Sequence, residues 1–151
     1  MSQDSYAQSP ISQIGDMLDD GLILTDLGGV ILSANPAAVR WFGESLTGQM
    51  IFDVINHPNI GELFAKAADG AKRYEMRYEP TNIVQREFRM RLQRIGDQSV
   101  ALLFLDMTLQ RNLEKVRRDF VANVSHELRS PLTSLAGFVE TMLSDEVPDP
   151  A

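Results

Sequence analysis

The sequence contains no cysteine. This absence excludes a disulfide scaffold, a cysteine-based zinc site, an iron–sulfur cluster and any thiol nucleophile. It also removes the thiol that a flavin photoreceptor needs to form a covalent adduct. A ligand held without a covalent bond is still compatible with such a composition.

Hydrophobic runs are also short. The most apolar stretch, Val100–Leu105, falls far below the roughly 20 residues that span a bilayer. Residues 1–10 are polar and contain neither the basic segment nor the apolar segment of a signal peptide. We therefore expect the chain, as given, to be cytoplasmic.

Positive charge is scarce relative to negative charge. The 14 Lys and Arg residues face 21 Asp and Glu residues, which gives a formal net charge of −7 at pH 7. Non-specific nucleic-acid binding needs cations that neutralise phosphates, so we expect no nucleic-acid partner. With 44% hydrophobic and 23% charged residues, the composition is that of a globular protein with a buried core.

The first half of the chain predicts a polar, flexible segment over 1–10, followed by short elements. Apolar residues at helical spacing from Ile11 to Leu18 predict a helix. The turn Asp26-Leu27-Gly28-Gly29 between two apolar runs predicts a β-hairpin, and Asn35-Pro36 favours a helix start. The expected elements are a helix over 11–18, strands over 22–25 and 30–32, and a helix over 36–41.

The second half predicts another helix and three strands. Asn56-His57-Pro58-Asn59 is typical of a helix entry, and alternation with a period of two around Met76 and Met90 indicates strands. The expected elements are a helix over 60–69 and strands over 73–78, 88–93 and 100–105, the last in the centre of the sheet. Four arginines at alternate positions are interpreted as the solvated face of an edge-side strand, with an anionic partner as the alternative: Arg86, Arg89, Arg91 and Arg94.

After Asp106 the pattern becomes that of one long helix. Apolar residues from Leu109 to Leu143 recur every three or four residues, and an extra four-residue step interrupts the coiled-coil spacing. A helix of about 35 residues with one narrow apolar face must pair with another helix, most simply with the same helix of a second subunit. The alternative is a helix folded back on its own domain.

His126 is the candidate reactive residue of this helix. At about 100° per residue, its imidazole lies on the side opposite the apolar stripe. An unperturbed imidazole is largely neutral at pH 7, so an exposed one offers a nucleophilic nitrogen. Glu127 beside it is suited to orienting the ring or accepting its other proton. On spacing alone, however, a solvated surface histidine is the better interpretation.

The segment Phe120–Thr133, FVANVSHELRSPLT, resembles the H-box of bacterial sensor histidine kinases, with its nearest likeness in the phosphate-regulon sensor kinase group. The resemblance implies that His126 accepts the γ-phosphoryl group of ATP and passes it to an aspartate of a response regulator receiver domain. It also implies that Glu127 is the adjacent acid/base. Ser130 stands where phosphatase-competent relatives often carry Thr or Asn, so the resemblance implies a phosphatase role for its hydroxyl.

The region before this helix resembles a PAS domain in the segments 20–26 and 30–38 and in the junction Asp106-Met107-Thr108. The implied fold class is α+β: a five-stranded antiparallel sheet with flanking short helices, followed by one long helix that forms a dimeric coiled coil or bundle. The implied domains are a PAS sensor domain over 11–107, a signalling helix with the first helix of the phospho-acceptor hairpin over 108–146, and a tail over 147–151.

A working kinase of this family needs parts that the sequence does not contain. The sequence has no glycine-rich phosphate-binding loop, and no second hairpin helix follows Leu143 in it. ATP and Mg²⁺ are therefore implied only for an absent ATP-binding catalytic domain, and we expect no cofactor or metal in this chain. We interpret the chain as a truncated part of a homodimeric kinase whose parent is anchored in the inner membrane. The alternative is a non-catalytic PAS module that only dimerises and senses a ligand.

Other residues of the sensor region have competing interpretations. His57 is the one histidine there that could serve as a haem ligand, but we interpret it as part of a helix entry. Four aromatic residues could line a pocket for an unknown small ligand, although such residues more often belong to the core: Trp41, Phe42, Tyr74 and Tyr78.

Overall fold

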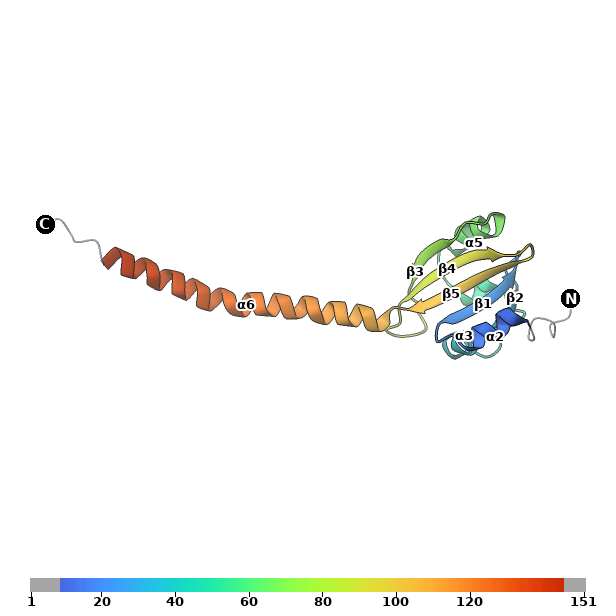
Figure 1. Ribbon diagram of the computed structural model, residues 1–151, viewed down its shortest axis with the longest axis horizontal. Coiled ribbons are helices and arrows are strands. Elements are labelled where there is room, and N and C mark those ends of the chain that lie inside the picture. The colour runs from blue at the N-terminus through green and yellow to red at the C-terminus, as the bar shows by residue number, and fades with distance from the viewer. Residues whose placement is uncertain (1–8, 146–151) are drawn as a thin grey trace. The chain divides into compact units, whose positions relative to one another are not determined.

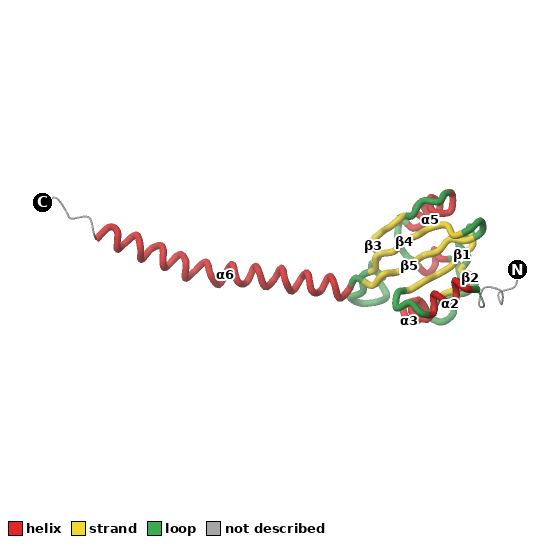
Figure 2. The backbone as a smooth tube through the Cα atoms, in the orientation of Figure 1, coloured by secondary structure: helices red, strands yellow, loops and turns green. Residues whose placement is uncertain are grey.

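The structure, a computed structural model, describes residues 9–145 (Figure 1). The chain divides into two compact units between Thr108 and Leu109, and each unit is described by itself. Figure 2 follows the same path coloured by secondary structure. The elements of the first unit are α2 (Pro10–Asp16), β1 (Gly21–Asp26), β2 (Ile31–Ala34), α3 (Pro36–Phe42), α4 (Ile51–Val54), α5 (Ile60–Asp69), β3 (Tyr74–Tyr78), β4 (Phe88–Ile95) and β5 (Ser99–Asp106).

The five strands form one antiparallel sheet in the order β2-β1-β5-β4-β3. On one side, β5 pairs with β1 from Ser99 opposite Asp26 to Phe104 opposite Gly21. On its other side, β5 pairs with β4, where Phe104 lies opposite Met90. The most apolar strand is therefore central, as expected. The five-stranded antiparallel sheet confirms the expected fold class.

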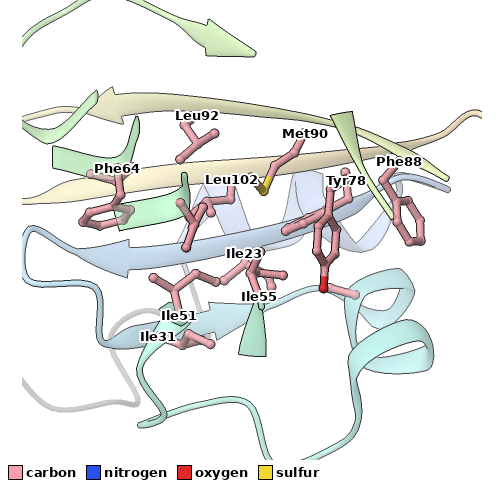
Figure 3. Packing of buried hydrophobic residues seen from close by; sticks show 14 of the residues in the cluster. Ile23, Ile31, Ile51, Ile55, Phe64, Tyr78, Phe88, Met90, Leu92 and Leu102 are labelled. Atoms are coloured by element: carbon pink, nitrogen blue, oxygen red, sulfur yellow. The ribbon is translucent and has the colours of Figure 1, made fainter. Parts of the chain in front are cut away.

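The core lies on one face of this sheet. Alternate residues of β4 and β5, such as Met90 and Leu102, are fully buried there because successive side chains of a strand point to opposite faces. The helices contribute Ile51 from α4 and Phe64 from α5 to the same cluster. Figure 3 shows these side chains converging on one layer. The period of two that the sequence shows over 88–93 thus identified the buried residues of β4.

Aromatic rings make up much of this core. The ring centroids of Trp41 and Phe88 lie 4.9 Å apart, as do those of Phe42 and Phe104. The buried Tyr78 lies 6.5 Å from Phe88. Tilted and stacked contacts of this kind stabilise aromatic clusters beyond the area that they bury. Of the aromatic residues considered as a pocket lining, Trp41, Phe42 and Tyr78 thus pack on other rings of the core, and the partly buried Tyr74 packs against the same cluster, in agreement with their interpretation as core residues.

Asn35 ties three elements together. Its buried side chain accepts hydrogen bonds from the backbone N–H groups of Leu22 (2.8 Å) and Ala38 (3.0 Å). Its Nδ2 donates to the backbone carbonyls of Gly15 (2.7 Å) and Asp20 (2.8 Å). The sequence predicted only the role of Asn35 as a cap for α3. One amide therefore fixes the end of α2, the start of β1 and the start of α3 to one another.

The N-terminal region differs from expectation in two ways. Helix α2 begins at Pro10, inside the segment expected to be flexible, and ends before Met17. Its apolar residues Ile11 and Ile14 are exposed. Residues 1–8 lie outside the described residues. Helix α4 was not anticipated, because four residues are too few to show a helical period.

The second unit contains all of α6 (Thr108–Asp145) except its first residue. This helix has 38 residues and continues through Pro131. This confirms the expected long helix. In the isolated chain its apolar side chains are exposed, Leu113 and Leu128 among them. None of the helices within residues 9–145 is long and apolar enough to cross a membrane. The expected tail, 147–151, lies outside the described residues.

Candidate functional site

His126 lies near the middle of α6, with about five helical turns on each side. Its side chain is exposed, whereas Val124 is the one half-buried side chain over 109–144. At about 100° per residue, the two side chains point about 160° apart around the helix axis. The imidazole is thus held on a rigid element, on the polar side, where a large partner can approach it.

Glu127 and Ser130 share the exposed surface around His126. Ser130 follows His126 by four residues, which places the two side chains on adjacent turns of one face. Glu127 is the next residue and lies about 100° further around the helix. Within residues 9–145, neither side chain makes a hydrogen bond or an ion pair. The helix therefore brings an imidazole, a carboxylate and a hydroxyl to one exposed surface, and these are the three residues that the H-box resemblance singled out.

Pro131 changes the backbone beside this surface. Proline has no N–H, so the backbone carbonyl of Glu127 loses the donor that an α-helix would supply from residue 131. Further along, the hydroxyl of Thr133 donates to the carbonyl of Arg129 at 2.7 Å. Such back-bonding adds a second donor to a carbonyl already in the helix. The hydrogen bonding of α6 is thus altered within one turn of His126.

His57 serves a different purpose. It is half-buried in the turn before α5, and its Nδ1 accepts a hydrogen bond from the backbone N–H of Asn59 at 3.1 Å. This geometry agrees with its interpretation as part of a helix entry.

The arginines of the sheet are paired to a degree that the sequence did not show. Three of them lie on β4, which is an inner strand between β5 and β3 and not an edge strand. Arg91 pairs with Glu75 of β3 at 2.8 Å. Arg94 donates to the carbonyls of Ala68 (2.9 Å) and Asp97 (2.8 Å). Of the three arginines on β4, Arg91 therefore makes a cross-strand ion pair and Arg94 binds backbone carbonyls of α5 and of the following turn, while Arg89 is exposed as expected.

The sequence did not predict the hydrogen bonds that fix Thr108, the first residue of α6. Asp106 Oδ1 accepts from the backbone N–H of Thr108 (2.9 Å), and Thr108 Oγ1 accepts from the backbone N–H of Glu87 (3.1 Å). The backbone carbonyl of Glu87 also accepts from Met107 N–H at 2.8 Å. Asp106 further pairs with Arg86. Partial burial would raise the pKa of Asp106, but the hydrogen bonds from Thr108 and the pairing with Arg86 hold it below its usual value.

Comparisons with known proteins place these features in a family. Residues 116–151 match the His Kinase A (phospho-acceptor) domain, and residues 13–75 match a PAS domain. The phosphate regulon sensor protein PhoR of Pseudomonas aeruginosa is 37% identical over 135 residues, which cover 87% of this chain and 30% of that protein. The sensor protein kinase WalK of Staphylococcus epidermidis is 32% identical over 131 residues, covering 83% of this chain and 21% of that protein.

Solved structures agree on the fold of the first unit. The PAS domain of Bordetella pertussis BvgS superposes with a TM-score of 0.51 at 15% identity, covering 72% of this chain and 95% of that one. The PAS domain of an HTR-like protein from Haloarcula marismortui gives a TM-score of 0.50 at 15% identity, covering 68% of this chain and 98% of that one. The chain spans less than a third of the length of the curated relatives above. The chain therefore consists of a PAS domain followed by a His Kinase A phospho-acceptor region, the arrangement that it shares with these sensor kinases.

Proposed function

We propose that this chain is the sensor and phospho-acceptor portion of a two-component histidine kinase, with His126 as the phosphorylated residue. The observation that carries the proposal is the exposed imidazole of His126 on α6, inside the segment that matches the phospho-acceptor domain. ATP and Mg²⁺ belong to a separate catalytic domain, which supplies the phosphoryl group. A response regulator receiver domain then takes that group onto an aspartate. Because both steps use ATP and a receiver domain of the cytoplasm, the proposal places the chain there. We further propose that its parent protein is anchored in the inner membrane.

The chemistry asked of this chain is that of a positioned nucleophile. The lone pair of a ring nitrogen of His126 attacks the γ-phosphorus, a P–N bond forms, and the bond to the bridging oxygen of ADP breaks with its electron pair. Glu127, the adjacent carboxylate, orients the ring and takes the proton of its other nitrogen. Phosphoryl transfer depends mostly on positioning, which a long rigid helix supplies. Ser130 is proposed to orient water when the phosphoryl group is removed again.

The apolar side chains of α6 support a homodimer. Leu109, Leu113 and Phe120 follow one stripe in its first half, and all three are exposed in the isolated chain. Burying a side chain of this size stabilises an assembly by about 1.5–3 kcal/mol. A second copy of α6 offers the same stripe and can cover it along its length. The PAS domain relays a signal into this dimer, either from an unidentified small ligand or from another domain.

The test supplies the missing domain in trans. The ATP-binding domain of the Pseudomonas aeruginosa relative and ATP labelled at the γ-phosphate are added to the purified chain. We expect label on the wild type and on His57→Ala, but none on His126→Ala. Label on none of the three would contradict the proposal and would favour the PAS module that only dimerises and senses a ligand.

A further inference from the structure

His57 helps to cap helix α5, although it lies before the helix in the sequence. Its Nδ1 accepts a hydrogen bond from the backbone N–H of Asn59 at 3.1 Å, and its carbonyl accepts from the backbone N–H of Ile60 at 3.2 Å. Asn59 is the N-cap residue of α5, and its own side chain makes no capping hydrogen bond. Because the first N–H groups of a helix have no partners within it, the imidazole supplies one of the acceptors that this end needs.

The turn that contains His57 is anchored in the core at both of its ends. Ile55 before it and Ile60 after it are buried, and the backbone N–H of His57 donates to the carbonyl of Ile55 at 3.2 Å. One turn into α5, the ring of Phe64 lies in the same buried cluster as Ile55 (Figure 3). A change in the hydrogen bonding of His57 therefore reaches side chains that pack against the sheet.

The hydrogen bond to Asn59 and a proton compete for one lone pair. The neutral imidazole can accept at Nδ1, whereas the protonated ring carries an N–H at both nitrogens and can accept at neither. Protonation of His57 would therefore place two donors face to face. It would also place a positive charge at the N-terminal end of α5, where the helix dipole disfavours cations.

The described neighbours of His57 do not offset this cost with a negative partner. Within residues 9–145, His57 forms no ion pair. The titratable groups of the flanking helices are Asp53, which is exposed on α4, and Glu62 of α5, which pairs with a lysine of its own helix at 3.0 Å. From β3, Tyr78 contacts the backbone of Asn56, and burial raises the pKa of this phenol, which therefore stays neutral.

We propose that His57 makes the sensor domain responsive to pH, because its neutral ring caps α5 and its protonation releases this cap and loosens α5 from the sheet. Histidine is the side chain that ordinarily changes charge between about pH 5 and pH 8. His57 is the one histidine in residues 1–108, so the response has a single origin in the sensor domain. The inference does not rest on phosphorylation of His126.

The matched variant is His57→Asn, because the side-chain oxygen of Asn can accept a hydrogen bond at every pH and does not titrate. Urea unfolding of the full chain is followed by the fluorescence of Trp41, in a His126→Asn background that removes the other histidine. Between about pH 7.5 and about pH 5.5, the equilibrium constant for unfolding should rise about fivefold with His57 present, the equivalent of one helix cap. It should change little in His57→Asn.

The backbone amides report on the same event in the folded chain. In ¹H–¹⁵N NMR spectra, the amide signal of Asn59 should move over this pH range. The amide of Ser12 is the control, since it donates to the hydroxyl of Ser9 at 3.2 Å, a cap that does not titrate, and it should stay in place.

Equal pH dependence with His57 and with His57→Asn would overturn the inference, as would an Asn59 amide signal that stays in place. His57→Ala keeps the test decisive if the Asn variant fails to cap. It has no acceptor at any pH, so it should unfold about fivefold more readily than the chain with His57 at neutral pH and should lose the pH dependence. An alanine variant as stable as its parent at neutral pH would also refute the capping role.

Discussion

The amide of Asn35 gives a sharp test of how the sensor domain is held together. Replacing Asn35 by Ala removes four hydrogen bonds, two accepted from Leu22 and Ala38 and two donated to Gly15 and Asp20. Loss of an N-cap side chain alone costs about 1 kcal/mol, and each buried polar group left without a partner adds about 1–3 kcal/mol, less whatever water restores. We expect a loss of about 3 kcal/mol in the free energy of unfolding, or about 12–24 °C in melting temperature for a domain of this size.

The single tryptophan, Trp41, reports on this unit, because it packs against Phe88 in the core. Urea titrations followed by its fluorescence give the free energy of unfolding. Asn59→Ala is the matched control: Asn59 also precedes a helix, but its side chain makes no capping hydrogen bond, so its loss should cost less than about 0.5 kcal/mol. Equal effects of the two substitutions, or a cost below 1 kcal/mol for Asn35→Ala, would refute the reasoning.

Three further predictions follow from packing, charge and the apolar stripe. Gly21→Ala should destabilise the sensor domain by about 1–3 kcal/mol, because the added Cβ would lie 2.8 Å from Trp41 Cζ3; Gly70→Ala, with no atom within 4 Å, is its control in the same urea titration. The pKa of Asp106 is lowered in the fold, so its contribution to stability is present above the unfolded pKa near 3.9 and is lost as pH falls through the folded value. Asp106→Asn should therefore flatten the loss of stability between pH 5 and about pH 3, and an unchanged pH profile would contradict this assignment. Leu113→Asp should convert the proposed homodimer into a monomer in analytical ultracentrifugation, whereas Lys115→Asp, off the stripe, should leave the dimer intact.

The sequence predicted the elements whose pattern repeats, and it missed the contacts that join distant segments. Strands β3 and β4 were recognisable because apolar residues such as Met76 and Met90 recur with a period of two, and β5 was recognisable as the most apolar run of the chain. The long helix and its exposed His126 followed from the period of α6 in the same way. The contacts of Arg86 with Asp106 and of Glu87 with Thr108 were not predictable. Some 20 residues separate the partners, and no local pattern marks them. The hydrogen bonds of Asn35 to the backbone at the end of α2 and the start of β1 were not predictable for the same reason.

The charged side chains at the edge strand β3 affect whether two sensor domains held near each other aggregate. Charged side chains on and beside β3 form ion pairs: Arg73 pairs with Glu75, and Arg77 pairs with Glu79. The edge is therefore charged and not apolar. A dimer through α6 would raise the local concentration of a second sensor domain to about the millimolar range. At such concentrations an open strand edge is a template for adding foreign strands, and charged side chains along it discourage that addition. The charges along the edge of β3 thus disfavour aggregation of the two sensor domains that such a dimer would hold together.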